Sequence, residues 1–147
     1  HDGEPLEAPV AAFTVTGDAL SLGHVAVRYA GPGKGFGVFA LVALAQNTWL
    51  GDYLGEVLTQ EDYLVRYPDE DAQYVLQCNS DYNVDAADPA RSSYLRYLNH
   101  SAPAPNVFFE VVKRRKQRHK DVKFYTARDV QAGEELCFDY GKEYWSE

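Results

Sequence analysis

Short runs of β-branched, aromatic and small residues, separated by turn-forming residues, constrain this chain most. VAVRYA at 25–30, VFALVA at 38–43 and VFFEVV at 107–112 each lie next to glycine, proline or charged segments. Such runs are typical of strands that are bounded by turns. We expect helix mainly at 60–67, where it must stop before Pro68, because a proline ring disfavours the α conformation in the preceding residue. The pattern predicts a mostly β domain of several small sheets.

The same signals place the remaining elements. We expect one apolar strand with two glycines within 48–59, two short strands around a turn at 79–81, and a helical turn after Pro89. The clearest hairpin joins two branched and aromatic strands through the basic stretch 113–120. A turn at Ala132-Gly133 precedes the last expected strand.

Length and composition favour a single globular domain. The chain has 147 residues, of which 46% are hydrophobic and 24% charged, which excludes disordered and fibrous classes. We expect neither a membrane span nor a secretion signal, since no apolar run approaches about 18 residues and no charged, cleavable leader is visible. Because the first residue is His1, we expect a piece excised from a longer chain. Residues 1–20 are predicted to be a loosely ordered lead-in.

Charge is distributed unevenly. The net charge is −8, but the window 113–120 holds six of the 14 Lys and Arg residues and no acid, which leaves 8 basic against 22 acidic residues elsewhere. An acidic surface repels a phosphate backbone and attracts a Lys/Arg-rich protein segment. Cys78 and Cys137 lie far apart without CxxC spacing, which argues against a disulfide framework and a cysteine-rich zinc site.

The glycine-rich segment GPGKGFG at 31–37 has two readings. A phosphate-binding loop is excluded because no helix start and no Lys-Ser/Thr follow, and a dinucleotide fingerprint is excluded because no strand-helix-strand unit follows. A plain β-turn and a close approach of backbone to a ligand both remain open. The 11 tyrosines likewise fit either half-buried strand positions or a shared aromatic pocket.

Four segments in order carry a specific resemblance. GKGFGVFA, DYLGE, RYLNHS with a following PN, and GEELCFDYG resemble the SET domain of protein lysine methyltransferases over about residues 24–145. The resemblance implies a β-clip-like SET fold of small sheets, in which the chain end threads in a pseudoknot-like manner beneath the loop that bears Asn99 and His100. It also implies that residues 21–147 form the catalytic domain.

The resemblance implies S-adenosyl-L-methionine as cofactor. By motif position the cofactor candidates are Lys34, Gly35, Phe36, Gly37, Tyr74, Arg96, Tyr97, Asn99 and His100. The residue types suit this ligand. Glycines allow close backbone approach, the Asn amide offers a donor and an acceptor to an adenine edge, and aromatic rings can lie on the adenine or near the sulfonium.

Tyr53, Phe138 and Tyr140 are implied to line a narrow channel for the substrate lysine. Methyl transfer needs a neutral amine, and a desolvated channel beside a sulfonium lowers the pKa of the lysine. We expect the Tyr140 hydroxyl to orient the amine. In the family, Phe at position 138 rather than Tyr goes with more than one methyl transfer, so Phe138 predicts a di- or trimethylating enzyme.

The sequence also departs from the family pattern. Many members have a cysteine directly after the NHS motif that joins later cysteines to bind zinc, but NHS is followed here by Ala102 and no cysteine follows Cys137. We therefore expect no metal site. Tyr144 and Trp145 are candidates either for part of the channel wall or for an ordinary apolar contact near the chain end.

These residues predict a lysine methyltransferase that acts on a basic protein, most simply a histone tail in the nucleus. A SET-like binding module with little turnover and a methyltransferase for a non-histone protein are the alternatives. The basic connection is either a solvated turn or a weak DNA contact. Its residues are Lys113, Arg114, Arg115, Lys116, Arg118 and Lys120.

Overall fold

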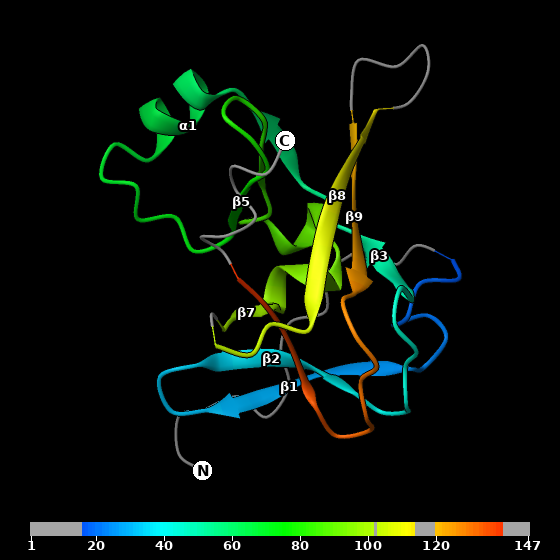
Figure 1. The fold of residues 1–147 in the computed structure, drawn as a ribbon. Coiled ribbons are helices and arrows are strands. Elements are labelled where there is room, and N and C mark those ends of the chain that lie inside the picture. Colours follow the sequence, from blue (N-terminus) through cyan, green and yellow to red (C-terminus); the bar gives the residue numbers. More distant parts are fainter. Residues whose placement is uncertain (1–15, 102, 114–119, 140–147) are drawn as a thin grey trace.

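The computed structural model describes residues 16–101, 103–113 and 120–139. Its strands form three small sheets with one short α-helix and two 3-10 turns, so the predicted mostly β fold is confirmed. Figure 1 shows the β8–β9 hairpin standing beside β3, the β1–β2 hairpin below it, and α1 on the side away from β3. The expected loose segment 1–20 lies largely outside the described residues, and Asp18 and Ala19 at its described end are buried.

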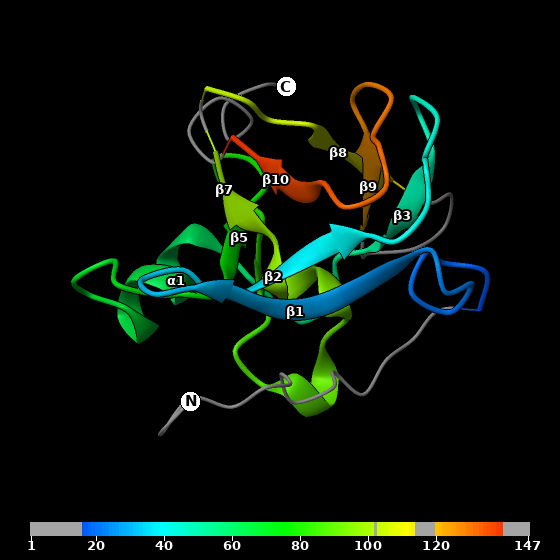
Figure 2. The ribbon, with the colours of Figure 1, turned by 90° about the horizontal axis from the view of Figure 1, so that it is seen from below.

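The first sheet brings together three distant parts of the chain. Its members, in spatial order, are β1 (Val25–Gly31), β2 (Gly35–Ala40), β10 (Glu135–Phe138) and β7 (Asn99–His100). The tight β1–β2 turn depends on Gly33 and Gly35, whose φ angles of 81° and 67° favour glycine. β10 pairs antiparallel with β2 and parallel with β7, as Figure 2 shows from below. The C-terminal strand thus lies beside the Asn99-His100 segment, as the predicted threading requires.

The other two sheets divide a segment for which the sequence pattern predicted a single strand. One sheet has the order β3 (Trp49–Asp52), β9 (Lys120–Thr126), β8 (Val107–Lys113), and the other has β4 (Glu56–Leu58), β6 (Asn83–Asp85), β5 (Val75–Gln77). The single strand expected within 48–59 was therefore wrong. The chain changes sheets at residues 53–55, and a side chain at Gly55 would collide with the Asp85 carbonyl. Glycine is needed there because β6 approaches so closely.

The short helical elements follow local signals. α1 (Gln60–Arg66) is capped by Thr59, whose side chain accepts a hydrogen bond from the Asp62 N–H, and the helix ends before Pro68 as predicted. The expected helical turn after residue 89 consists of two 3-10 turns, η1 (Pro89–Arg91) and η2 (Tyr94–Tyr97). No helix among these described elements is long and apolar enough to cross a membrane.

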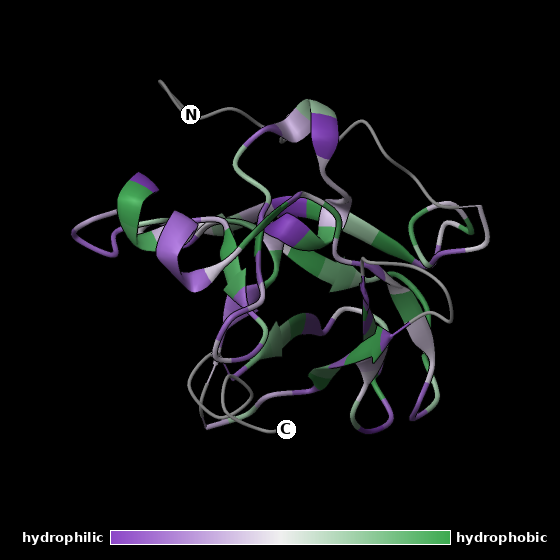
Figure 3. Ribbon diagram, turned by 90° about the horizontal axis from the view of Figure 1, so that it is seen from above, coloured by the Kyte–Doolittle hydropathy of each residue, from purple (hydrophilic) through white to green (hydrophobic). Residues whose placement is uncertain are grey.

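The hydrophobic core lies between the sheets and η2. Leu50, Phe124 and Leu136 are fully buried there, one from each of β3, β9 and β10. Tyr94 is also buried, and its hydroxyl donates to the Leu50 carbonyl at 2.6 Å. Figure 3 shows hydrophobic residues concentrated along the strands, with much of the hydrophilic surface on the connecting loops. The core therefore fixes η2, and the β7 segment that follows it, against the two strands from later in the chain.

Asn106 holds β10 in place through its side chain. Its Nδ2 donates to the Glu135 carbonyl at 2.9 Å, and its Oδ1 accepts from the Cys137 N–H at 2.8 Å. Its own N–H donates to the Cys137 carbonyl at 3.0 Å. Asn106 is 2% exposed, so water cannot replace these bonds. The PN segment of the sequence motif thus positions the strand that leads to Phe138.

Replacing Asn106 tests this anchor. Asn106→Ala leaves the Glu135 carbonyl and the Cys137 N–H buried without partners, and we expect it to lower the free energy of unfolding by about 2–4 kcal/mol. Urea denaturation followed by circular dichroism measures this loss. Asn79→Ala is the matched control, because the one hydrogen bond of this side chain within the described residues is exposed and comes from the Asp81 N–H. Equal losses for the two variants would contradict the anchoring role.

Candidate functional site

A cavity of about 310 Å³ lies where the β1–β2 turn, the segment before β5, η2 and β7 meet. Seven of the nine predicted cofactor residues line it, namely Lys34, Gly35, Phe36, Tyr74, Arg96, Tyr97 and Asn99. Gly33, Gln73 and Leu98 complete the lining. Sequence reasoning missed these three, although Gly33 and Leu98 lie directly beside predicted positions in the motifs.

Arg96 forms the inner wall of the cavity and is held without a carboxylate partner in the described part of the chain. Its guanidinium lies 3.9 Å from the centroid of the Tyr74 ring and 4.9 Å from that of Tyr97. Its Nε and Nη2 donate to the carbonyls of Ala86 and Ala87 at 2.8 and 3.1 Å. Arg96 is 8% exposed. Ring faces and carbonyl oxygens together stabilise this buried cation.

Three aromatic rings of the cavity lining, those of Phe36, Tyr74 and Tyr97, contact one another in a series. Tyr97 contacts Tyr74 edge to face with centroids 6.4 Å apart, and it contacts Phe36 with centroids 6.2 Å apart. Tyr29 of β1 extends the series behind Phe36, at 6.2 Å. Such a series provides ring faces and edges for a planar or cationic ligand.

Asn99 is fixed by a carboxylate that sequence reasoning did not select. Its Nδ2 donates to Glu135 Oε2 at 2.7 Å and to the Phe36 carbonyl at 3.1 Å. Lys34 Nζ donates to the other Glu135 oxygen at 2.8 Å. The hydrogen bond and the charge of Glu135 raise the pKa of the Lys34 ammonium, which keeps this residue cationic.

Gly37 and His100 do not line the cavity. A side chain at Gly37 would collide with Glu135 Oε2 and Asn99 Nδ2, so this glycine makes room for the bond between them. Close packing therefore explains the glycine at position 37, which does not line the cavity. His100 is exposed, and its backbone pairs with Phe138 of β10.

A second, narrow cavity of about 20 Å³ adjoins the first. Tyr53 and Phe138, two of the three predicted channel residues, line it together with Val75, Leu76 and Leu95. Gln73, Arg96 and Leu98 line both cavities, so these three side chains form the common wall. Tyr140, the third predicted channel residue, lies outside the described residues, as do Tyr144 and Trp145.

The narrow cavity is rigidly framed by aromatic packing. Phe138 contacts Phe124 and Phe109 edge to face, with centroids 5.3 and 6.3 Å apart. Tyr53 packs on Phe124 at 5.9 Å, and its hydroxyl donates to the Tyr74 carbonyl at 3.1 Å. Burial of these rings in one cluster leaves them little freedom to move. The Tyr53 hydroxyl ties the narrow cavity to the wall of the larger one.

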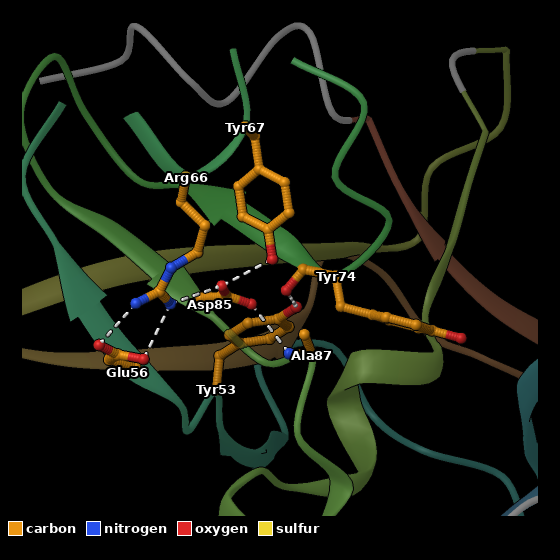
Figure 4. Close-up of polar contacts among 7 residues, drawn as sticks. All are labelled: Tyr53, Glu56, Arg66, Tyr67, Tyr74, Asp85 and Ala87. Atoms are coloured by element: carbon orange, nitrogen blue, oxygen red, sulfur yellow. Dashed lines mark hydrogen bonds and ion pairs between the residues drawn. The ribbon is translucent and has the colours of Figure 1, made fainter. Parts of the chain in front are cut away.

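An ionic cluster outside these two cavities supports the loop that holds Arg96 (Figure 4). The buried Asp85 carboxylate accepts from Arg66 Nη1 at 3.1 Å, the Tyr67 hydroxyl at 2.8 Å and the Ala87 N–H at 2.9 Å. Arg66 also pairs with both oxygens of Glu56. Burial and the Asp85 carboxylate raise the pKa of the Tyr67 hydroxyl, so it remains a donor. Asp85 thereby links α1 to residues 86 and 87, whose carbonyls bind Arg96.

The cysteines do not provide a reactive nucleophile. Cys78 and Cys137 are both buried and free of disulfides. Burial raises the pKa of Cys78 to about 12 and, with the charge of Glu135, that of Cys137 to about 11. Both are therefore thiols at neutral pH. In the described ranges, no group of three His, Cys, Asp or Glu side chains is arranged to hold a metal ion.

The basic hairpin connection lies mostly outside the described residues, which include only its two ends. Lys113 and Lys120 face each other in the β8–β9 ladder. Lys120 Nζ lies 5.4 Å from the centroid of the Tyr82 ring, and the Tyr82 hydroxyl donates to the Lys120 carbonyl at 2.9 Å. Lys120 is thus partly engaged within the fold, whereas Lys113 is exposed.

Comparison with known proteins agrees with this geometry. The SET domain family model matches residues 35–141. The chain is 32% identical over 118 residues to histone-lysine N-methyltransferase Su(var)3-9 of Drosophila melanogaster, covering 74% of this chain and 18% of that protein. It is 33% identical over 110 residues to histone-lysine N-methyltransferase MEDEA of Arabidopsis thaliana, covering 72% and 15%.

Another relative is histone-lysine N-methyltransferase SUV39H2 of Gallus gallus, at 31% identity over 113 residues, with coverage of 74% of this chain and 28% of that protein. The chain therefore spans less than a third of the length of these curated relatives. The region that the family model matches contains the β7–β10 pairing, all residues of the narrow cavity, and all residues of the larger cavity except Gly33 and Lys34. This chain belongs to the SET domain family.

Proposed function

We propose that this domain is an S-adenosylmethionine-dependent protein lysine N-methyltransferase that acts on a histone tail. One observation supports this most directly. The cavity lined by seven predicted cofactor residues shares a wall with the narrow cavity lined by Tyr53 and Phe138. Methyl transfer requires this arrangement, because a large ligand and a slender side chain must meet end to end in a site closed to water.

The residues of the larger cavity suit each part of the proposed cofactor. Phe36, Tyr74 and Tyr97 offer ring surfaces for a purine and for a positive charge. Lys34 and Arg96 offer donors to a carboxylate, and Asn99 offers an acceptor to an N–H group. S-adenosylmethionine, when bound, supplies a methyl group on a positively charged sulfur. The residues present therefore fit the group that the family resemblance implies.

The narrow cavity suits the entry of a lysine side chain. Its lining is mostly apolar and aromatic, with Gln73 and Arg96 as its polar members. Loss of water around the amine and the nearby Arg96 cation both lower the pKa of the lysine and favour the neutral form that carries a lone pair. Ring faces still tolerate the ammonium as it enters. Phe138 lacks a hydroxyl that would hold a water in this space, which supports addition of more than one methyl. Tyr140 is proposed to orient the amine through its hydroxyl.

The proposed substrate follows from charge and from the relatives. The relatives are histone-lysine methyltransferases by name, and an acidic chain attracts the Lys/Arg-rich tails of histones. Action on histones implies a nuclear location. A weak DNA contact by the basic connection 113–120 stays a prediction. A binding module without turnover is the alternative, and it predicts cofactor binding without methyl transfer.

Incubation of the domain with a mixture of core histones and isotopically labelled S-adenosylmethionine tests the proposal. Mass spectrometry of the products reports the substrate, the modified lysine and the number of methyl groups together. We expect label on lysine in a histone tail. Bound cofactor with no label transferred would favour the binding module. Label that appears only on non-histone proteins, in a parallel reaction with cell extract, would overturn the histone assignment.

Tyr140→Phe tests the proposed role of the tyrosine hydroxyl. We expect the rate of methyl transfer to fall by roughly a hundredfold or more, while cofactor affinity measured by calorimetry stays the same. The control is Tyr125→Phe, because the Tyr125 ring stacks on Phe108 of the hairpin and lines neither cavity. A Tyr140→Phe variant with the rate of the control would remove Tyr140 from this role.

Phe138→Tyr tests the proposed control of product. The added hydroxyl occupies or hydrates the narrow cavity, so we expect the variant to stop after one methyl group where the parent continues. The ratio of mono-, di- and trimethylated peptide over time, read by mass spectrometry, measures this change. Phe108→Tyr is the control, since it adds the same hydroxyl on a half-buried ring outside both cavities. An unchanged product ratio in Phe138→Tyr would refute the assignment.

A further inference from the structure

Glu135 contacts two residues of the larger cavity without lining that cavity itself. It lies on β10, and its side chain is 15% exposed. One carboxylate oxygen accepts from Asn99 Nδ2 at 2.7 Å and the other from Lys34 Nζ at 2.8 Å. Neither Lys34 nor Asn99 is near Glu135 in the sequence, so only the fold brings the three together.

The bonds of Asn99 determine which way its amide faces. Both neighbours of its Nδ2, the Glu135 carboxylate and the Phe36 carbonyl, are acceptors without protons to donate. A reversed amide would place Oδ1 against these two oxygens and lose both bonds. Among the described residues, Oδ1 accepts no hydrogen bond. Asn99 therefore meets a ligand in the cavity as an acceptor, not as the combined donor and acceptor that its residue type allows.

The backbone at Gly37 leaves space for the contact between Glu135 and Asn99. A side chain at Gly37 would collide with Glu135 Oε2 and lie 3.0 Å from Asn99 Nδ2. Gly37 therefore leaves the space in which the carboxylate reaches the amide. Lys34 lies on the other side of the carboxylate and balances its charge, with its own side chain 51% exposed.

We propose that Glu135 is a positioning residue of the cofactor site. It acts through Asn99 by holding the amide so that Oδ1 can accept a hydrogen bond from an N–H group of the ligand. This inference rests on the proposed function, because it takes S-adenosylmethionine as the ligand. It assigns a function to the second glutamate of the GEELCFDYG motif, which lines neither cavity.

A double-mutant cycle tests whether Glu135 acts through Asn99. Glu135→Met keeps the length of the side chain but removes both acceptors, and we expect it to weaken binding of S-adenosylhomocysteine about tenfold, the equivalent of one hydrogen bond. Glu135→Gln retains one acceptor, so its affinity is expected to lie between the parent and Glu135→Met. In an Asn99→Ala background, Glu135→Met should weaken binding no further. An equal tenfold loss in that background would overturn the proposal.

Glu134→Met is the matched control. Glu134 precedes Glu135, but its carboxylate binds Arg128 and the Gln131 N–H away from the cavity. We expect this variant to bind S-adenosylhomocysteine as the parent does. A weakening equal to that of Glu135→Met would mean that the loss reflects damage to β10 in general, and would overturn the proposal. Thermal unfolding of every variant verifies that the compared proteins are folded.

A measurement on the ligand-free domain separates this inference from the proposed function. Both Asn99 Nδ2 protons are hydrogen-bonded, so their side-chain amide signals in ¹H–¹⁵N NMR should exchange slowly with water in the parent and faster in Glu135→Met. Signals that do not change would overturn the positioning role. If the parent fails to bind S-adenosylhomocysteine, the proposed function fails, while the amide signals still decide whether Glu135 orients Asn99.

Discussion

The parallel pairing of β7 with β10 is the contact on which the two cavities depend. Only two residue pairs form it, Asn99 with Cys137 and Phe138 with His100. So short a ladder has little stability of its own, because two strands need further packing to persist in water. Two supports supply that packing. Asn106 binds the β10 backbone on both sides of Leu136, and Phe138 packs edge to face against Phe109 and Phe124. The site is therefore built from a nonlocal contact that the rest of the core stabilises.

The common wall of the two cavities would allow one fold to bind the two proposed ligands side by side. Arg96 lines both cavities. Its guanidinium donates to the carbonyls of Ala86 and Ala87 and lies over the rings of Tyr74 and Tyr97. Tyr53 lines the narrow cavity while its hydroxyl binds the backbone of Tyr74. The two cavities thus share a wall and a hydrogen bond that fix their relative position. Close packing of this kind maintains alignment between two sites more precisely than separate loops would.

Local signals in the sequence were enough to predict much of the fold. The β1–β2 and β8–β9 hairpins, and the stop of α1 before Pro68, follow from turn residues and strand-type runs alone. The order of the motifs along the chain predicted most of the residues that line the larger cavity, although no rule of local secondary structure identifies them. Periodicity could not show that the chain changes sheets near Gly55, because the reason is a distant backbone, that of Asp85. The partners of Asn99 and Arg96 were equally hidden, since Glu135 and residues 86–87 meet them only after folding.

The distribution of charge suggests different recognition of the two proposed ligands. The chain as a whole is acidic, with a net charge of −8, yet the larger cavity is lined by Lys34 and Arg96 and, among the described residues, by no Asp or Glu. Arg96 is held by carbonyls and rings, and Lys34 by Glu135, so both cationic groups are positioned before a ligand binds. The cavity therefore offers a ligand positioned cationic donors together with ring surfaces. The acidic excess lies outside it, where long-range attraction can draw a basic protein segment without disturbing the geometry at the cofactor.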